Sequence, residues 1–123
     1  MSKRVLSVGQ CSMDHGALST MLERNFGAEV VPAETAADAL VALGHEKFDL
    51  VMVNRKLDAD YSDGIEIIRQ IKADPRLAGT PCMLVTNYPE HQEAAVAAGA
   101  ELGFGKQGYH RPETRERLAR FLG

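Results

Sequence analysis

The chain has 123 residues and a mass of 13.4 kDa, which is the length of one domain spanning residues 1–123, because single hydrophobic cores usually hold about 100–150 residues. Its hydrophobic content of 45% and charged content of 25% are those of a folded globular protein and exclude a disordered or fibrous chain. With 14 basic and 17 acidic residues, the formal charge of −3 gives no overall attraction to nucleic acid or to an anionic membrane.

The first half of the chain predicts two strand–helix units and a further strand. Residues 5–8 form the first strand, and Ser12 is expected to cap a helix that ends at Gly27. Residues 29–33 form the second strand, and the following helix is expected to stop at Gly44. Residues 50–54 form the third strand, which should be central because it is apolar on both faces from Leu50 to Val53.

The second half of the chain continues the same alternation. Isoleucines at helical spacing from residue 65 to residue 71 predict a third helix that ends before Pro75. Residues 82–86 and 102–106 are the fourth and fifth strands, separated by a short alanine-rich helix from about Glu90 to Ala98. Pro112 stands in the first turn of the last helix. This alternation predicts an α/β three-layer sandwich, whose functional sites lie beyond the carboxyl ends of the strands.

Four segments together resemble the receiver domain of two-component response regulators, the CheY-like type. Residues 48–54 (FDLVMVN) resemble its YDLVLLD strand, and residues 63–72 (DGIEIIRQIK) resemble its D-G-x-E-x-x-x-x-I-[KR] helix. Residues 80–86 (TPCMLVT) resemble T-P-V-I-x-L-T, and residues 98–101 (AGAE) with Lys106 resemble A-G-A-D and the active-site lysine. The resemblance covers essentially the whole chain and implies a flavodoxin-like fold with five helices and strand order 2-1-3-4-5.

The resemblance also implies where the chemistry of this family would lie. In the family, an aspartate ending the third strand accepts a phosphoryl group, and two acids ending the first strand hold magnesium. The corresponding positions here are Asn54, Gly9 and Gln10. An amide oxygen is too weakly basic to replace the nucleophile, and neither glycine nor glutamine offers magnesium an anionic ligand. We therefore expect an atypical receiver domain that is not phosphorylated, binds no magnesium or other cofactor and is not an enzyme.

Other positions of the family pattern predict how such a domain would act. Thr86 and Lys106 match family residues that follow the phosphoryl group, whereas Gly103 replaces the aromatic switch residue three positions before the lysine. In the family, the fourth helix, fifth strand and last helix form the docking and dimer surface. We therefore expect a signal-transduction domain that contacts a protein partner, or a second copy of itself, through the region from Glu90 to Gly123.

An alternative from a different functional class is a domain that binds a small anionic ligand. Without the family's three carboxylates, the predicted pocket keeps Lys106, adds Arg55 and Lys56, and lies at the positive end of the first helix. The competing interpretation is that Lys106 only hydrogen-bonds Asn54 or Gln10, while the other two basic side chains face solvent.

The remaining candidates for chemistry are expected to be structural. Cys11 and Cys82 lie in no metal-binding or CxxC spacing, so we expect two buried, reduced thiols. Asp14 is expected to face outward from the first helix. No run of about 20 apolar residues or secretory signal is present, which predicts a cytoplasmic protein without membrane contact. Solvent-facing positions are expected for the histidines, which are His15, His45, His91 and His110.

Overall fold

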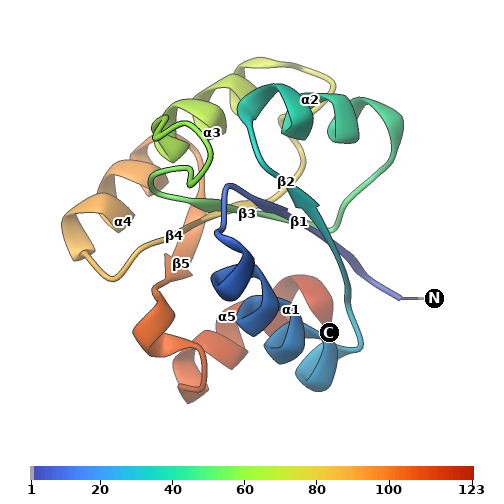
Figure 1. The fold of residues 1–123 in the computed structure, drawn as a ribbon, viewed down its shortest axis with the longest axis vertical. Helices are drawn as coiled ribbons and strands as arrows, with labels where there is room; N and C mark the ends of the chain where they lie inside the picture. The colour runs from blue at the N-terminus through green and yellow to red at the C-terminus, as the bar shows by residue number, and fades with distance from the viewer. Residues whose placement is uncertain (1) are drawn as a thin grey trace.

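The computed structural model describes residues 2–123, which form a parallel five-stranded sheet between two layers of helices (Figure 1). The strand order is β2-β1-β3-β4-β5, which confirms the predicted topology. In chain order the elements are β1 (Arg4–Val8), α1 (Ser12–Phe26), β2 (Glu29–Ala33), α2 (Ala36–His45), β3 (Leu50–Asn54), α3 (Gly64–Ala73), β4 (Cys82–Val85), α4 (Pro89–Ala97), β5 (Glu101–Phe104), the 3-10 turn η1 (Lys106–Gly108) and α5 (Pro112–Leu122).

The sheet separates two hydrophobic clusters. Helices α1 and α5 cover one face, and α2, α3 and α4 cover the other (Figure 1). In β3, Val51 and Val53 belong to the cluster under α2, α3 and α4, while Leu50 and Met52 belong to the cluster under α1 and α5. All four side chains are completely buried, which confirms that this strand is central.

The start of α1 differs from the sequence prediction. Cys11, not Ser12, is the N-cap, and its Sγ accepts a hydrogen bond from the backbone N–H of Asp14 at 3.4 Å. Cys11 is only partly buried, which corrects the prediction of two buried thiols, whereas Cys82 is buried as predicted; both thiols are free. At the other end of α1, Gly27 adopts the left-handed conformation with φ of 63° and ends the helix as predicted.

Two other boundaries are also corrected. The α2 helix continues through Gly44 to His45, because Gly44 does not adopt the positive φ that would end a helix there. The last strand is displaced toward the N-terminus and ends at Phe104, so Lys106 lies in the η1 turn rather than in the strand. This turn carries the lysine beyond the carboxyl edge of the sheet.

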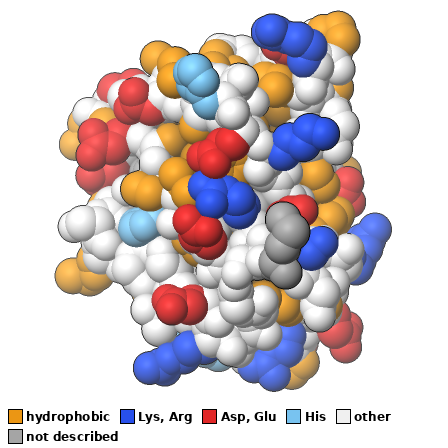
Figure 2. All heavy atoms as spheres, turned by 90° about the vertical axis from the view of Figure 1, so that its right-hand side faces the viewer, with side chains coloured by type: hydrophobic (Ala, Val, Ile, Leu, Met, Phe, Trp, Pro, Cys, Tyr) orange, Lys and Arg blue, Asp and Glu red, His pale blue; other side chains and the backbone are white. Residues whose placement is uncertain are grey.

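Charges of both signs are interspersed on the face seen in Figure 2, where β1 begins. Arg4 forms ion pairs with Glu29 at 2.9 Å and with Glu46 at 2.8 Å. This face therefore lacks the continuous basic surface that typically binds nucleic acid. Among residues 2–123, no helix combines the length and the apolar character needed to cross a bilayer.

Candidate functional site

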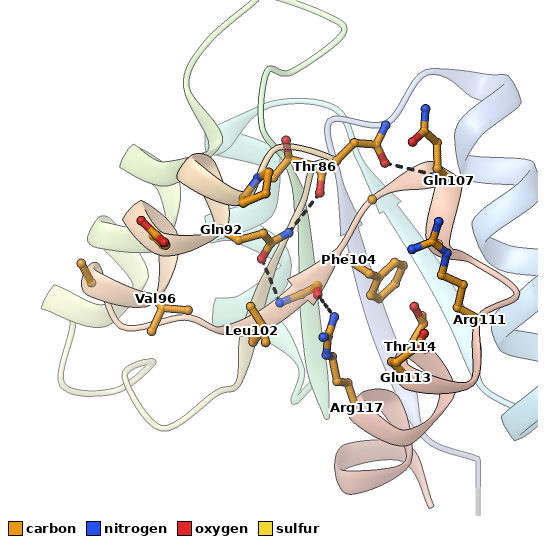
Figure 3. Close-up of a pocket in the computed structure, with 17 residues that line it drawn as sticks. Thr86, Gln92, Val96, Leu102, Phe104, Gln107, Arg111, Glu113, Thr114 and Arg117 are labelled. Atoms are coloured by element: carbon orange, nitrogen blue, oxygen red, sulfur yellow. Dashed lines mark hydrogen bonds between the residues drawn. The ribbon is translucent and has the colours of Figure 1, made fainter.

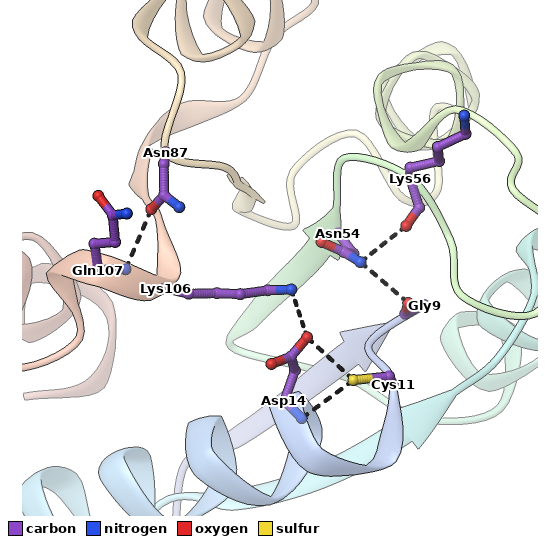
Figure 4. Close-up of polar contacts among 8 residues, drawn as sticks. All are labelled: Gly9, Cys11, Asp14, Asn54, Lys56, Asn87, Lys106 and Gln107. Carbon is purple, nitrogen blue, oxygen red and sulfur yellow. Dashed lines mark hydrogen bonds and ion pairs between the residues drawn. The ribbon is translucent and has the colours of Figure 1, made fainter.

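The pocket residues predicted from the sequence meet at the carboxyl edge of the sheet. Asn54 ends β3, Gly9 and Gln10 directly follow β1, Thr86 directly follows β4, and Lys106 begins η1. Because all five strands are parallel, their carboxyl ends lie at the same edge, which is why residues so distant in the sequence come together. Figure 4 shows the polar contacts that several of these residues make.

The side chain of Asn54 is held by two backbone carbonyl groups (Figure 4). Its Nδ2 donates to the oxygen of Lys56 at 2.8 Å and to the oxygen of Gly9 at 3.4 Å. The opposite orientation of the amide would place its oxygen against two other oxygens, so the NH₂ group must face them. The two carbonyl oxygens are consequently occupied by the amide hydrogens of Asn54.

These residues do not fit a magnesium ion. Magnesium in proteins is usually held through one or two carboxylates, whereas the ends of β1 and β3 present Gly9, Gln10 and Asn54. The Asn54 NH₂ group also directs hydrogens, rather than oxygens, into the space between the two strand ends. Within the described part of the chain, no group of three or more His, Cys, Asp or Glu side chains could hold a metal ion.

Asp14 points into the site, so the prediction that it faces outward is wrong. Its carboxylate forms an ion pair with the ammonium group of Lys106 and accepts a hydrogen bond from the Cys11 thiol at 3.1 Å (Figure 4). Burial raises the pKa of Asp14, but hydrogen bonds from Lys106 and Cys11 and the charge of Lys106 outweigh that effect, so the pKa lies below its ordinary value.

This ion pair changes the electrostatics predicted for the pocket. The carboxylate of Asp14 neutralises Lys106, so the site carries less positive charge than the sequence predicted. Lys106 therefore pairs with Asp14. The sequence had predicted instead that Lys106 either binds an anion or hydrogen-bonds Asn54 or Gln10. The cavity at this point has a volume of about 250 Å³ and is lined by Asn54, Arg55, Lys56, Val85, Thr86, Asn87, Tyr88 and Lys106.

Replacing Asp14 with asparagine is expected to lower the free energy of unfolding at neutral pH by less than about 1 kcal/mol, because both partners of the ion pair are partly exposed to solvent. A depressed pKa gives stability that is present above the unfolded-state pKa of about 3.9 and lost as pH falls through the folded-state pKa. Urea denaturation of the two proteins should therefore show that their difference in the free energy of unfolding is smaller at about pH 3 than at about pH 7. An equal difference in the free energy of unfolding at both pH values would contradict the ion pair between Asp14 and Lys106.

Gly103, which the resemblance predicted to replace an aromatic switch residue, is part of a buried polar network (Figure 3). Its N–H donates to Gln92 Oε1 at 2.9 Å, and its carbonyl oxygen accepts from Arg117 Nη1 at 2.8 Å. Gln92 Nε2 donates to the carbonyl oxygens of Leu84 at 2.9 Å and Thr86 at 3.2 Å. Two side chains thus satisfy backbone groups on the edge strand β5 that β4 does not pair.

The backbone at Gly103 has room for glycine only. A Cβ atom there would lie 2.4 Å from the carbonyl oxygen of Leu84, in the neighbouring strand. The sequence prediction singled out Gly103 but gave no indication of Gln92 and Arg117, whose side chains hold this segment. The only sequence signal for Gln92 is its place as an uncharged polar residue in the first turn of a short, alanine-rich helix.

A groove of about 870 Å³ lies between α4, β5 and α5 (Figure 3). Gly103 and Phe104 of β5 line it, together with Val96 of α4 and Leu102 of β5, whose exposed fractions are 45% and 49%. Arg111, just before α5, also lines it and is exposed. Most of the groove's lining belongs to the region, residues 90–123, that the sequence predicted as the docking surface, and the lining combines apolar contact area with charged groups.

Comparison with known protein families gives one match over most of the chain. Residues 12–109 match the family described as response regulator receiver domain. Among curated proteins, the chain is 34% identical over 118 residues to the carbamoyl phosphate synthase pyrimidine-specific small chain of Halalkalibacterium halodurans. That alignment covers 94% of this chain, which spans about 30% of the length of that relative.

Solved structures share the fold at low sequence identity. A putative response regulator from Chloroflexus aurantiacus superposes with a TM-score of 0.84 at 20% identity, covering 99% of this chain and 98% of the other. The signal receiver domain of a DNA binding response regulator from Colwellia psychrerythraea gives 0.80 at 24% identity, with 97% of each chain covered. The receiver domain of a sensor histidine kinase from Pseudomonas aeruginosa, described with magnesium coordinated in its active site cleft, gives 0.72 at 20% identity, covering 99% of this chain and 95% of the other.

Proposed function

Because this chain belongs to the response regulator receiver domain family, we propose that it is a non-enzymatic signalling domain that works without phosphorylation, through contact with a protein partner. The observation that carries this proposal is the amide of Asn54 at the end of β3, which donates to two backbone carbonyl groups. A phosphoryl acceptor at this place needs an anionic oxygen, and an amide provides none.

The absence of a cofactor is part of the same proposal. The receiver domain from Pseudomonas aeruginosa is described with a magnesium ion in its cleft. In this chain, Gly9, Gln10 and Asn54 offer no anionic ligand at the strand ends, and Asp14 is engaged by Lys106. We therefore propose that no magnesium ion is required and that the domain is regulated by its partner.

The groove between α4, β5 and α5 is the proposed docking surface. Val96 and Leu102 are exposed there, and such apolar groups beside a concave surface suit an apolar anchor side chain of a partner. The charged side chains that line the groove are of both signs, since the exposed carboxylates of Glu93 and Glu113 lie there with Arg111 and Arg117. The proposed partner segment is therefore apolar at its centre, with polar or charged groups of both signs around that centre.

Replacing Val96 with glutamate is expected to reduce the amount of cross-linked partner in cells at least about tenfold, because it places a charge beside the apolar anchor. Val41→Glu is the matched control, since Val41 is also an exposed valine on a helix and lies outside the groove. Cross-linking in the native host, followed by mass spectrometry of the products, measures the effect.

The outcomes of this experiment separate the proposal from its alternatives. The same cross-linked proteins in equal amounts from both variants would overturn the docking surface. Sedimentation of the purified protein tests whether the partner is a second copy: a dimer lost on Val96→Glu and kept on Val41→Glu would assign the groove to self-association.

A further inference from the structure

The η1 turn lies between the carboxyl-edge site and the docking groove. Gln107 and Gly108 line the groove (Figure 3). Lys106, at the start of the same turn, lines the small cavity beside Asn54, and its ammonium group pairs with Asp14 (Figure 4). None of the three residues of η1 is buried. Polar contacts to neighbouring segments, rather than apolar packing of the turn itself, therefore decide where η1 lies.

Two such contacts tether η1 in different directions (Figure 4). The N–H of Gln107 donates to Asn87 Oδ1 at 3.2 Å, which ties the turn to the segment just before α4, on the α4 side of the groove. The ion pair between Lys106 and Asp14 ties the turn to α1, none of whose residues line the groove. The width of the groove at this end therefore depends on both contacts.

The carboxylate of Asp14 is itself held in place. Asp14 lies in the first turn of α1, where a negative charge is favoured by the helix dipole. Its backbone N–H donates to Cys11 Sγ at 3.4 Å, and its carboxylate accepts from the Cys11 thiol at 3.1 Å. Among residues 2–123, Asp14 is the only carboxylate that forms an ion pair with Lys106. Lys106 thus has one fixed anionic partner, which this chain supplies from another element.

We propose that Asp14 is a positioning residue for docking: through its ion pair with Lys106, it holds η1 where the end of the groove stays open to the partner. This inference rests on the docking groove proposed above and identifies what sets its shape. Neither Asp14 nor Lys106 lines the groove, so any effect of these side chains on docking acts through η1. Because the pair is internal to the chain, docking requires no added charged group at the carboxyl edge.

Amide exchange measured by NMR on the purified whole chain tests the first step. Asp14→Asn should raise the exchange rates of the Gln107 and Gly108 amides about two- to fivefold, which is the size expected when a partly exposed ion pair is lost. The amide of Thr80 donates to Leu77 in a turn at the opposite edge of the sheet, and its exchange rate should stay the same. An unchanged exchange rate at both η1 amides would overturn the proposal.

The matched control is Asp38→Asn. Asp38 is the third residue of α2, as Asp14 is of α1, and its N–H also donates to the side chain of the N-cap residue. It is exposed and forms no ion pair within residues 2–123, so Asp38→Asn removes the same helix-terminal charge without releasing η1. The exchange rates of the η1 amides should therefore be those of the unchanged chain.

A double-variant cycle separates the ion pair from other effects of the two substitutions. Lys106→Gln should raise the exchange rates of the η1 amides as much as Asp14→Asn does. The double variant should raise them no further than either single variant, because the same interaction is lost only once. Effects of the two substitutions that multiply in the double variant would show that they act independently, and this would overturn the proposal.

Cross-linking in the native host then tests whether the position of η1 affects docking. Asp14→Asn should lower the amount of cross-linked partner about two- to fivefold, and Asp38→Asn should leave it unchanged. A loss with Val96→Glu but not with Asp14→Asn would overturn this inference and leave the groove as the docking surface. No loss with Val96→Glu would overturn the docking groove itself, whatever the amide exchange of η1 shows.

Discussion

Replacing Gln92 with leucine is expected to lower the free energy of unfolding by about 3 kcal/mol, because it leaves several buried backbone groups without partners. The Gln92 amide serves the carbonyl oxygens of Leu84 and Thr86 and the N–H of Gly103, and its side chain is buried. Each unsatisfied buried group costs about 1–3 kcal/mol. Urea denaturation measures the loss.

The control for this variant is Gln70→Leu, which makes the same chemical change on the exposed surface of α3. It should change the free energy of unfolding by no more than about 0.5 kcal/mol, as is usual for surface substitutions. A loss of less than about 1 kcal/mol for Gln92→Leu would mean that water replaces the amide, and the polar network would then have little role in holding β5.

The fold was predictable from the sequence because its signals are local and repeated. The strand residues 50–53 are apolar on both faces, and this alone indicates a strand covered by helices on both sides. The helix over residues 64–73 places its isoleucines at helical spacing, and Pro75 fixes where it must end. Each of these features depends on residues a few positions apart, so no tertiary information was needed.

The site was less predictable because its contacts depend on how the helices lie against the sheet edge. Asp14 was expected to face outward, but the start of α1 turns it toward Lys106, which is distant in the sequence. Cys11 rather than Ser12 caps this helix, since the first residue with helical backbone angles is decided by the path of the chain after β1. The prediction that the histidines face solvent is wrong for His15 and His91, because both side chains are partly buried and the Nδ1 atom of each ring is buried.

Incubation with acetyl phosphate and magnesium should leave the intact mass of the chain unchanged, because Asn54 offers no nucleophilic oxygen. The single variant Asn54→Asp should also remain unlabelled, since Gly9 and Gln10 add no charge for the metal ion. Intact-mass spectrometry measures both results. A gain of one phosphoryl group by the unchanged chain would refute the proposal that the domain works without phosphorylation.

The double variant Gln10→Asp/Asn54→Asp is the positive counterpart of this experiment. It places one carboxylate after β1 and one at the end of β3, beside Thr86 and Lys106, and we expect it to take up a phosphoryl group detectably. Gly9 is left unchanged, because its φ of 76° and a distance of 2.3 Å from an added Cβ to Leu57 Cγ would strain any other residue. Labelling of the double variant but not of Asn54→Asp would show that the missing metal ligand, and not the nucleophile alone, keeps this domain unphosphorylated.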